Sequence, residues 1–190
     1  MRQSDSPPGE DESAASEPPA DPRKRDPKTI EIVAVRLLAR REHSLQELRR
    51  KLKARGYVEE GIETVLQKLA AKKLVSDDRF VTSFVDHHAR RGQGPVRIRA
   101  ELRQQGLDTE LIEQNIDAAD VDWAAQAREV RRRKFGTKLP RGIPERAKQA
   151  RFLQYRGFSA EQIRAALNGS PEDGDEEAGA SEYGADPDLA

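Results

Sequence analysis

The sequence predicts an all-α protein made of three tandem three-helix units between two acidic tails. Apolar residues recur at the three- and four-residue spacing of amphipathic helices over most of the chain. The composition, 35% hydrophobic and 36% charged in 190 residues, suits small units that pack on their neighbours better than one deep core. Glycines and apolar residues also recur in register about every fifty residues, which indicates tandem units.

The repeat is anchored by Gly56, Gly106 and Gly157, each of which we expect to end a helix. A leucine lies four residues before each glycine, and an apolar residue directly follows it. Two further apolar positions agree in the next helix. The aligned sets are Leu52, Leu102 and Leu153; Tyr57, Leu107 and Phe158; Ile62, Ile112 and Ile163; and Leu66, Ile116 and Leu167. Agreement at five positions in three units is improbable by chance, so we infer tandem repeats.

The first unit, residues 28–75, begins with a helix whose apolar face includes Ile30 and Leu38. A capping box is predicted next, in which the Ser44 hydroxyl and the Glu47 carboxylate both bond to free amides at the start of the middle helix. That middle helix carries leucines on one side and basic residues around the rest, as an amphipathic surface helix does.

The third helix of this unit has a weaker start than its counterparts. Val58 stands where Asp108 and Ser159 cap the equivalent helices, and Gly61 lies inside the helix. A lost cap and an interior glycine each cost about 1 kcal/mol. We therefore expect this helix to fray most readily.

The second unit, residues 76–119, is expected to begin at the helix cap Ser76. Its middle helix opens at Gly94 and Pro95, because proline is well placed in a first helical turn. Asp108 caps its third helix.

The third unit, residues 120–167, is expected to begin near Asp122. A longer loop, 137–143, precedes a helix that we expect to start at Pro144, and Ser159 opens a second capping box. Trp123 is interpreted as a core anchor between units, with base stacking as the alternative.

Charge is partitioned along the chain, although the net charge is zero. Residues 1–27 hold 4 basic and 7 acidic groups, and residues 168–190 hold none and 8. Residues 28–167 keep 30 basic and 19 acidic groups, a net charge of +11. Both tails have little to bury and are expected to be disordered. The C-terminal tail could screen the basic body as an electrostatic lid, or it could serve only solubility.

The residue types that catalysis and metal binding need are scarce. Cysteine is absent, which excludes disulfides and thiolate chemistry and fits a cytoplasmic location. No stretch approaches the roughly 20 apolar residues that span a bilayer, and the acidic N-terminus is not a secretory signal. His43, His87 and His88 are better explained by surface or interhelical hydrogen bonds than by metal or substrate binding. We predict no catalytic residue, cofactor, metal or membrane partner.

Two short motifs have both a functional and a structural interpretation. The segment 92–94 has two glycines, as a phosphate loop does, but no strand precedes it and no Lys-Ser/Thr pair follows, so a turn is favoured. Asp77 and Asp78 could form a catalytic carboxylate pair, but the positive end of a helix is sufficient to explain them.

The basic body is expected to bind a polyanion or an acidic protein surface. If the units stack, cations on corresponding helices would form a stripe that binds phosphates without reading sequence. The candidate residues are Arg49, Arg50, Lys53, Arg90, Arg91, Arg97, Arg99, Arg103, Arg131, Arg132, Arg133 and Lys134. Alternatively, many of them pair with carboxylates such as Glu47, Glu101 and Glu145 and only solvate the surface.

Five segments in this order resemble the RecX family, regulators of the bacterial recombinase RecA. They are Leu37–Leu48, Lys53–Tyr57, Leu74–Phe80, Arg91–Leu102 and Gln149–Phe158, all within residues 28–167. Neither tail is covered, and Val58 and Gly61 depart from the usual start of their helix. The resemblance implies three three-helix units in an elongated, curved right-handed array.

The resemblance also implies a function. Such a protein would dock in the groove of the RecA filament on single-stranded DNA, span neighbouring protomers, and mainly inhibit filament extension, ATP hydrolysis and strand exchange in recombination, DNA repair and the SOS response. We expect a monomer, with single- and double-stranded DNA as weaker partners. The alternative is a free-standing, sequence-nonspecific nucleic-acid-binding helical protein.

Overall fold

The computed structural model describes Lys24 and residues 26–168. The described residues form helices and connecting turns, and they confirm the all-α class. The helices are α1 Pro27–Leu38, α2 Leu45–Lys53, α3 Glu59–Ala71, α4 Asp77–Arg90, α5 Pro95–Gln104, α6 Thr109–Ala118, α7 Trp123–Phe135, α8 Gly142–Arg156 and α9 Ala160–Asn168. The tails predicted to be disordered lie outside the described residues, apart from the few at their inner ends.

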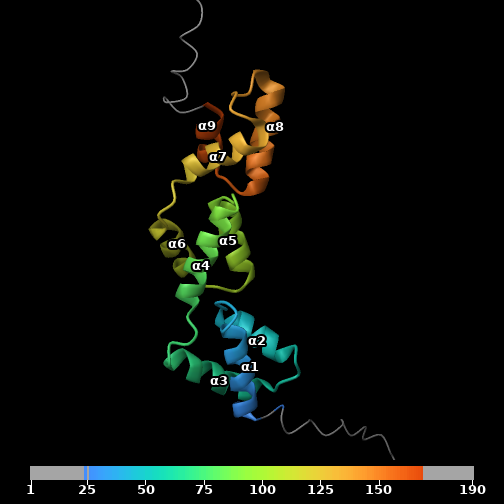
Figure 1. Cartoon of the computed structure of the whole chain (residues 1–190), viewed down its shortest axis with the longest axis vertical. Helices are drawn as coiled ribbons and strands as arrows, with labels where there is room; N and C mark the ends of the chain where they lie inside the picture. Colours follow the sequence, from blue (N-terminus) through green and yellow to red (C-terminus); the bar gives the residue numbers. More distant parts are fainter. Residues whose placement is uncertain (1–23, 25, 169–190) are drawn as a thin grey trace, which may run out of the picture.

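The nine helices of the described region form three three-helix units that follow one another along an elongated molecule (Figure 1). Each unit has its own hydrophobic core. The aligned leucines Leu52, Leu102 and Leu153 are each 0% exposed, so the same repeat position supplies the centre of all three cores. The tandem-repeat prediction is therefore confirmed.

Most helix starts follow their predicted caps. The Ser44, Ser76 and Asp108 side chains each accept a bond from the backbone N–H three residues on. The capping box at Ser159 is complete, because Gln162 also accepts a bond from the Ser159 N–H at 2.8 Å. Val58 gives α3 no side-chain cap, as expected.

Three local predictions differ from the structure. α1 begins inside the predicted tail, because the Asp26 carboxylate accepts bonds from the N–H groups of Lys28 and Thr29. α8 begins at Gly142 rather than Pro144. Only half of the first capping box forms: Ser44 caps α2, but the Glu47 carboxylate turns instead to three basic side chains.

The middle helices α2, α5 and α8 follow one another along the long axis (Figure 1). Gly106 and Gly157 end α5 and α8 with φ of +80° and +90°, as predicted for the helix-ending glycines. The second and third units meet at what we call the second junction. There the backbone N–H groups of Gly94 and Val96 donate to the carbonyls of Arg156 and Gly157 at 2.8 and 3.0 Å. The end of α8 thus caps the start of α5, joining the positive end of one helix to the negative end of another.

This second junction is closely packed. A Cβ added to Gly94 would lie 2.3 Å from the Gly157 carbonyl oxygen, and one added to Gly157 would lie 2.2 Å from the Arg97 Cβ. Trp123, at the start of α7, packs against the core of the second unit, as its predicted role as an anchor requires. At the first junction, between the first and second units, the glycine equivalent to Gly157 is Gly106. A Cβ added to Gly106 would lie near only the flexible Gln46 side chain. None of the described helices has the length and hydrophobicity of a membrane-spanning segment.

Candidate binding surface

Eleven of the twelve candidate cations lie on α2, α4, α5 and α7, and Arg91 directly follows α4. The predicted stripe needs corresponding helices, and α2 and α5 do correspond. Arg131–Lys134, however, lie at the end of α7, which is the first helix of its unit rather than the middle one. The three sets therefore do not occupy equivalent repeat positions.

Two of the candidates form the same ion pair in consecutive units. The Arg49 guanidinium donates to the Glu63 carboxylate at 2.9 Å, and Arg99 donates to Glu113 at 2.6 Å. Arg103 shares Glu113 at 2.9 Å. Each pair joins the middle helix of a unit to its third helix, so these arginines help to hold the unit together while they stay at the surface.

Further candidates also have carboxylate partners. Lys53 pairs with Glu59 at 2.6 Å, and Arg132 and Arg133 share Glu129 on α7 itself. Seven of the twelve are paired in total, so the alternative interpretation of paired surface charges accounts for most of the predicted surface.

Arg97 combines an ion pair with an aromatic contact. Its Nε donates to Glu101 at 2.7 Å, and its guanidinium lies 5.8 Å from the centre of the Tyr155 ring on α8. The hydrogen bond that Arg97 donates to Glu101 raises the pKa of Arg97. Arg97 thus contributes to the second junction as well as to the exposed charge.

Arg131 is not part of the exposed surface, because it is only 4% exposed. Its guanidinium donates to the carbonyls of Lys138 and Thr137 at 2.9 and 3.3 Å. Arg131 therefore braces the loop between α7 and α8.

Arg50, Arg90 and Lys134 are exposed and form no ion pair with any described residue. Within the described residues, the Arg91 guanidinium forms no ion pair and lies 3.5 Å from His87 Nε2. These side chains are the members of the predicted set that remain available to an anionic partner. Arg50 also lines a cleft of about 620 Å³ between the first two units, together with Arg41 and His87.

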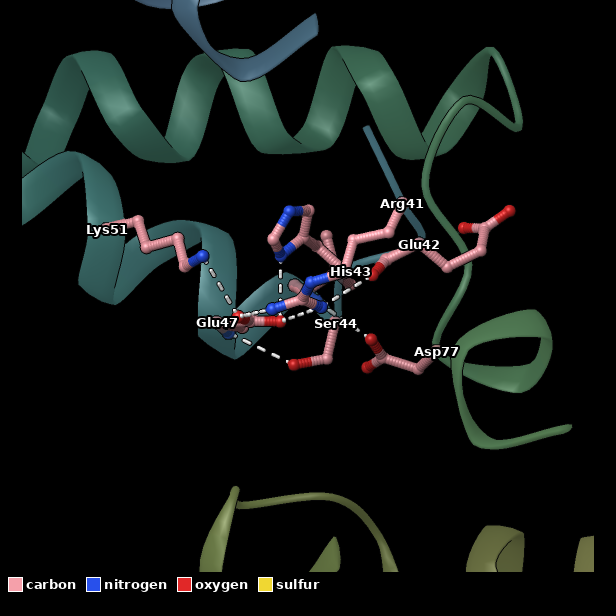
Figure 2. Close-up of polar contacts among 8 residues, drawn as sticks. Arg41, Glu42, His43, Ser44, Glu47, Lys51 and Asp77 are labelled. Carbon is pink, nitrogen blue, oxygen red and sulfur yellow. Dashed lines mark hydrogen bonds and ion pairs between the residues drawn. The ribbon is translucent and has the colours of Figure 1, made fainter. Parts of the chain in front are cut away.

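Figure 2 shows a polar cluster around the buried Glu47. Three of its members, Arg41, Glu42 and Glu47, line this cleft. The Glu47 carboxylate is at the centre of the cluster and contacts Arg41, His43 Nδ1 at 2.8 Å and Lys51 Nζ at 3.2 Å. Burial would raise the pKa of Glu47, but hydrogen bonds from Arg41 and His43 outweigh it and lower that pKa to about 2. Burial lowers the pKa of His43 and outweighs the opposite effect of Glu47.

The cluster also connects the two units. Asp77, at the start of α4, accepts a bond from the backbone N–H of Leu45 at 2.8 Å. Arg79 of the same helix pairs with Glu42 at 3.0 Å. Asp77 therefore caps a helix of the preceding unit, which goes beyond its predicted effect on its own helix start. Among the residues described, no group of histidines and carboxylates could hold a metal ion.

Sequence reasoning missed a group of cations in the third unit. The positions equivalent to the Arg49–Glu63 pair are occupied there by Ala150 and Arg164, so the stabilising pair is replaced by an unmatched charge. Lys138, Arg141 and Lys148 line a cleft between the α7–α8 loop and α8. The repeat alignment could have drawn attention to this unit, because its lost acidic position appears in the sequence.

Three family models match consecutive parts of the chain. They describe the first, second and third three-helix domains of RecX and match residues 33–69, 76–114 and 120–167. Among solved structures, the crystal structure of RecX from Lactobacillus salivarius has a TM-score of 0.65 and 19% identity, covering 75% of this chain and 94% of that one. This likeness confirms the fold.

Relatives of known name are much closer in sequence. Regulatory protein RecX of Halorhodospira halophila is 47% identical over 146 residues, which cover 77% of this chain and 91% of the relative. Regulatory protein RecX of Pseudomonas fluorescens strain SBW25 is 49% identical over 143 residues, covering 73% of this chain and 92% of the relative. With three domain matches in order and these identities over most of its length, the chain belongs to the RecX family of regulatory proteins.

Proposed function

We propose that this protein regulates the RecA recombinase by binding in the groove of the RecA filament on single-stranded DNA. It spans neighbouring protomers and mainly inhibits filament extension, ATP hydrolysis and strand exchange. The observation that carries the proposal is the match of the whole three-unit body to regulatory proteins named RecX. An elongated body with a net charge of +11 over residues 28–167 also fits a groove that has protein walls and a phosphate floor.

The direct test adds the purified protein to RecA on single-stranded DNA at a stoichiometric ratio. ATP hydrolysis should slow and the filaments should be shorter in electron micrographs. Unchanged ATPase and unchanged filament length would refute the proposal.

The structure sharpens the choice of variants. Reversing Arg97, Arg99 or Arg103 would also place like charges beside Glu101 or Glu113, so a loss of inhibition could come from local instability. Arg50→Gln with Arg90→Gln breaks no ion pair among the described residues and adds no negative charge beside carboxylates of the same clefts, such as Glu47 and Asp86. The double variant should weaken inhibition several-fold, since each change removes an attraction. Lys28→Gln with Arg36→Gln, an equal charge change on α1, is the matched control and should have a smaller effect.

The unpaired cations also favour a second candidate function, sequence-nonspecific binding to nucleic acid without RecA. It predicts that binding to naked DNA weakens steeply as salt rises, because each neutralised phosphate releases counterions. Equal retention of DNA at low and high salt would rule it out.

A further inference from the structure

The third unit contains a cleft of about 360 Å³, separate from the cleft at the first junction. It lies between the loop that follows α7 and the first two turns of α8. Its lining residues are Phe135, Lys138, Leu139, Arg141, Glu145, Lys148 and Gln149. Charged, apolar and amide groups thus meet in one space.

Three cations, Lys138, Arg141 and Lys148, line the cleft. All three are exposed, and none forms an ion pair within the part of the chain that the structure describes. The one carboxylate of the cleft, Glu145, accepts a bond from the backbone N–H of Arg141 at 2.7 Å and so serves the start of α8. The cleft therefore has an excess of positive charge, as a phosphate site requires.

Gln149 also lines the cleft but is buried, with only 7% of its surface exposed. Its Oε1 is a buried acceptor with no hydrogen-bond partner among the described residues. Buried amides are normally satisfied, so an orphaned one that lines a cleft indicates a missing partner. A carboxamide both donates and accepts hydrogen bonds, which suits the edge of a nucleobase or a sugar hydroxyl.

The cleft also has an apolar wall and a braced loop. Phe135 lies edge-on to Phe152, with ring centres 5.3 Å apart, and Leu139 is 38% exposed beside it. The buried Arg131 guanidinium holds the carbonyls of Thr137 and Lys138 and so fixes the loop that carries one of the cations. The site is thus built before any ligand arrives, which lowers the entropic cost of binding.

We propose that this cleft binds one unpaired nucleotide of a single-stranded nucleic acid. The strand phosphate lies against Lys138, Arg141 and Lys148, and the base edge or sugar reaches Gln149. A duplex keeps its bases stacked and paired, so it can offer the cleft only phosphates at the rim. An acidic peptide offers carboxylates to the cations but has no ring for the apolar wall. This contact needs no RecA and so stands or falls independently of the proposed regulatory function.

The first experiment follows the side-chain amide signals of Gln149 in full-length, ¹⁵N-labelled protein, assigned by their absence in Gln149→Leu. Oligothymidine should shift these signals at lower concentration than a duplex of equal length, a mononucleotide or a glutamate-rich peptide. An unmoved Gln149 amide would overturn the proposal, and so would an equal shift with the duplex or the peptide. A mononucleotide that binds more tightly than the strand would assign the cleft to free nucleotides instead.

The second experiment measures oligothymidine affinity by fluorescence anisotropy. Arg141→Ala with Lys148→Ala should weaken binding about tenfold and lower the salt slope by about 0.7, because the cleft loses its one phosphate contact and each such contact to a single strand contributes about 0.7. Lys28→Ala with Arg36→Ala on α1 removes the same charge far from the cleft and should change affinity by less than about twofold. Equal losses in the two variants would show general electrostatic attraction and refute a built site. Both pairs are exposed, so the fold should be retained, and melting temperatures check this.

Discussion

Glu47 carries a buried negative charge at the junction of the first two units. It lies within reach of Arg41, His43 and Lys51, which replace the water that it loses. Because these contacts hold its pKa at about 2, the folded state binds a proton less readily than the unfolded chain does. The contribution of Glu47 to stability is therefore present above its unfolded pKa of about 4.5 and is lost as the pH falls towards 2.

This linkage predicts the behaviour of Glu47→Gln. The variant should lose on the order of 3 kcal/mol of unfolding free energy near neutral pH, and the deficit should shrink as the pH falls through the window from about 4.5 to 2. Urea unfolding at a series of pH values measures it. Glu63→Gln is the control, since this carboxylate also has a lowered pKa but is more open to solvent than Glu47 and so is more strongly screened. Parallel pH profiles for wild type and Glu47→Gln would contradict the assignment.

Gly157 and Gly106 allow a second test at single residues. Both have a left-handed φ, so alanine costs about 1–2 kcal/mol at either position from backbone strain alone. An alanine Cβ at Gly157 would also lie 2.2 Å from the Arg97 Cβ, whereas at Gly106 the nearest atom is the flexible Gln46 Cγ at 3.4 Å.

Gly157→Ala should therefore destabilise the protein by at least about 2 kcal/mol more than Gly106→Ala, because only the former must separate two units. Thermal and urea unfolding of the two variants gives the comparison. Equal losses of unfolding free energy in the two variants would mean that the second junction can rearrange to accept a methyl group.

At the scale of the helix, α3 has the weakest start among the third helices of the three units. Val58 leaves its first N–H groups without a side-chain cap, whereas Asp108 caps the equivalent α6 with a 3.0 Å bond to the Leu111 N–H. Val58→Ser should add a cap worth about 1 kcal/mol, partly offset by the loss of a half-buried valine. Hydrogen exchange measures the effect: amides at the start of α3 should exchange faster than those of α6 in the wild type and slow in the variant. Faster exchange in α6 would contradict the prediction.

Local signals predicted the helices well because caps and stops act within a few residues. Ser44, Asp108 and Gly157 all took their expected places. The contacts between units were not predictable in the same way. The Gly157 carbonyl caps α5 and Asp77 caps α2 because segments distant in sequence meet in the fold. Neither contact produces a recognisable pattern in the neighbouring sequence.

The candidate surface was predictable in charge but not in arrangement. Composition identified a basic body, yet it could not show that Arg49 and Arg99 are each held by a glutamate of the next helix or that Arg131 points inward. Pairing depends on three-dimensional neighbours, and a run of arginines looks the same in sequence whether it braces a loop or faces solvent. The cations that remain available to an anionic partner are consequently the unpaired ones of the first junction and the third unit.

For the whole molecule, the distribution of charge leads to a prediction about the C-terminal tail. Its acidic groups, 8 in residues 168–190, follow a helix that ends beside the start of α8. The Arg146 guanidinium of α8 donates to the Leu167 carbonyl and, at 2.8 Å, to Asn168 Oδ1. Asn168, the last described residue, therefore lies next to the helix that carries Lys148. Because charges act over a Debye length of about 10 Å at 0.1 M salt, we expect the acidic groups that follow in the sequence to weaken anion binding to the third unit.

Deleting residues 169–190 should raise the affinity for single-stranded DNA several-fold at low salt, because a competing anion is removed from the vicinity of the third unit. The gain should vanish at high salt, where the tail is already screened. A full-length variant with the acidic residues of this segment replaced by Asn and Gln separates charge from chain length, and it should match the deletion. Anisotropy titrations of the three proteins at several salt concentrations provide the measurement. If the low-salt affinity does not change, the tail serves solubility alone; if only the deletion raises it, the tail excludes DNA by its bulk rather than its charge.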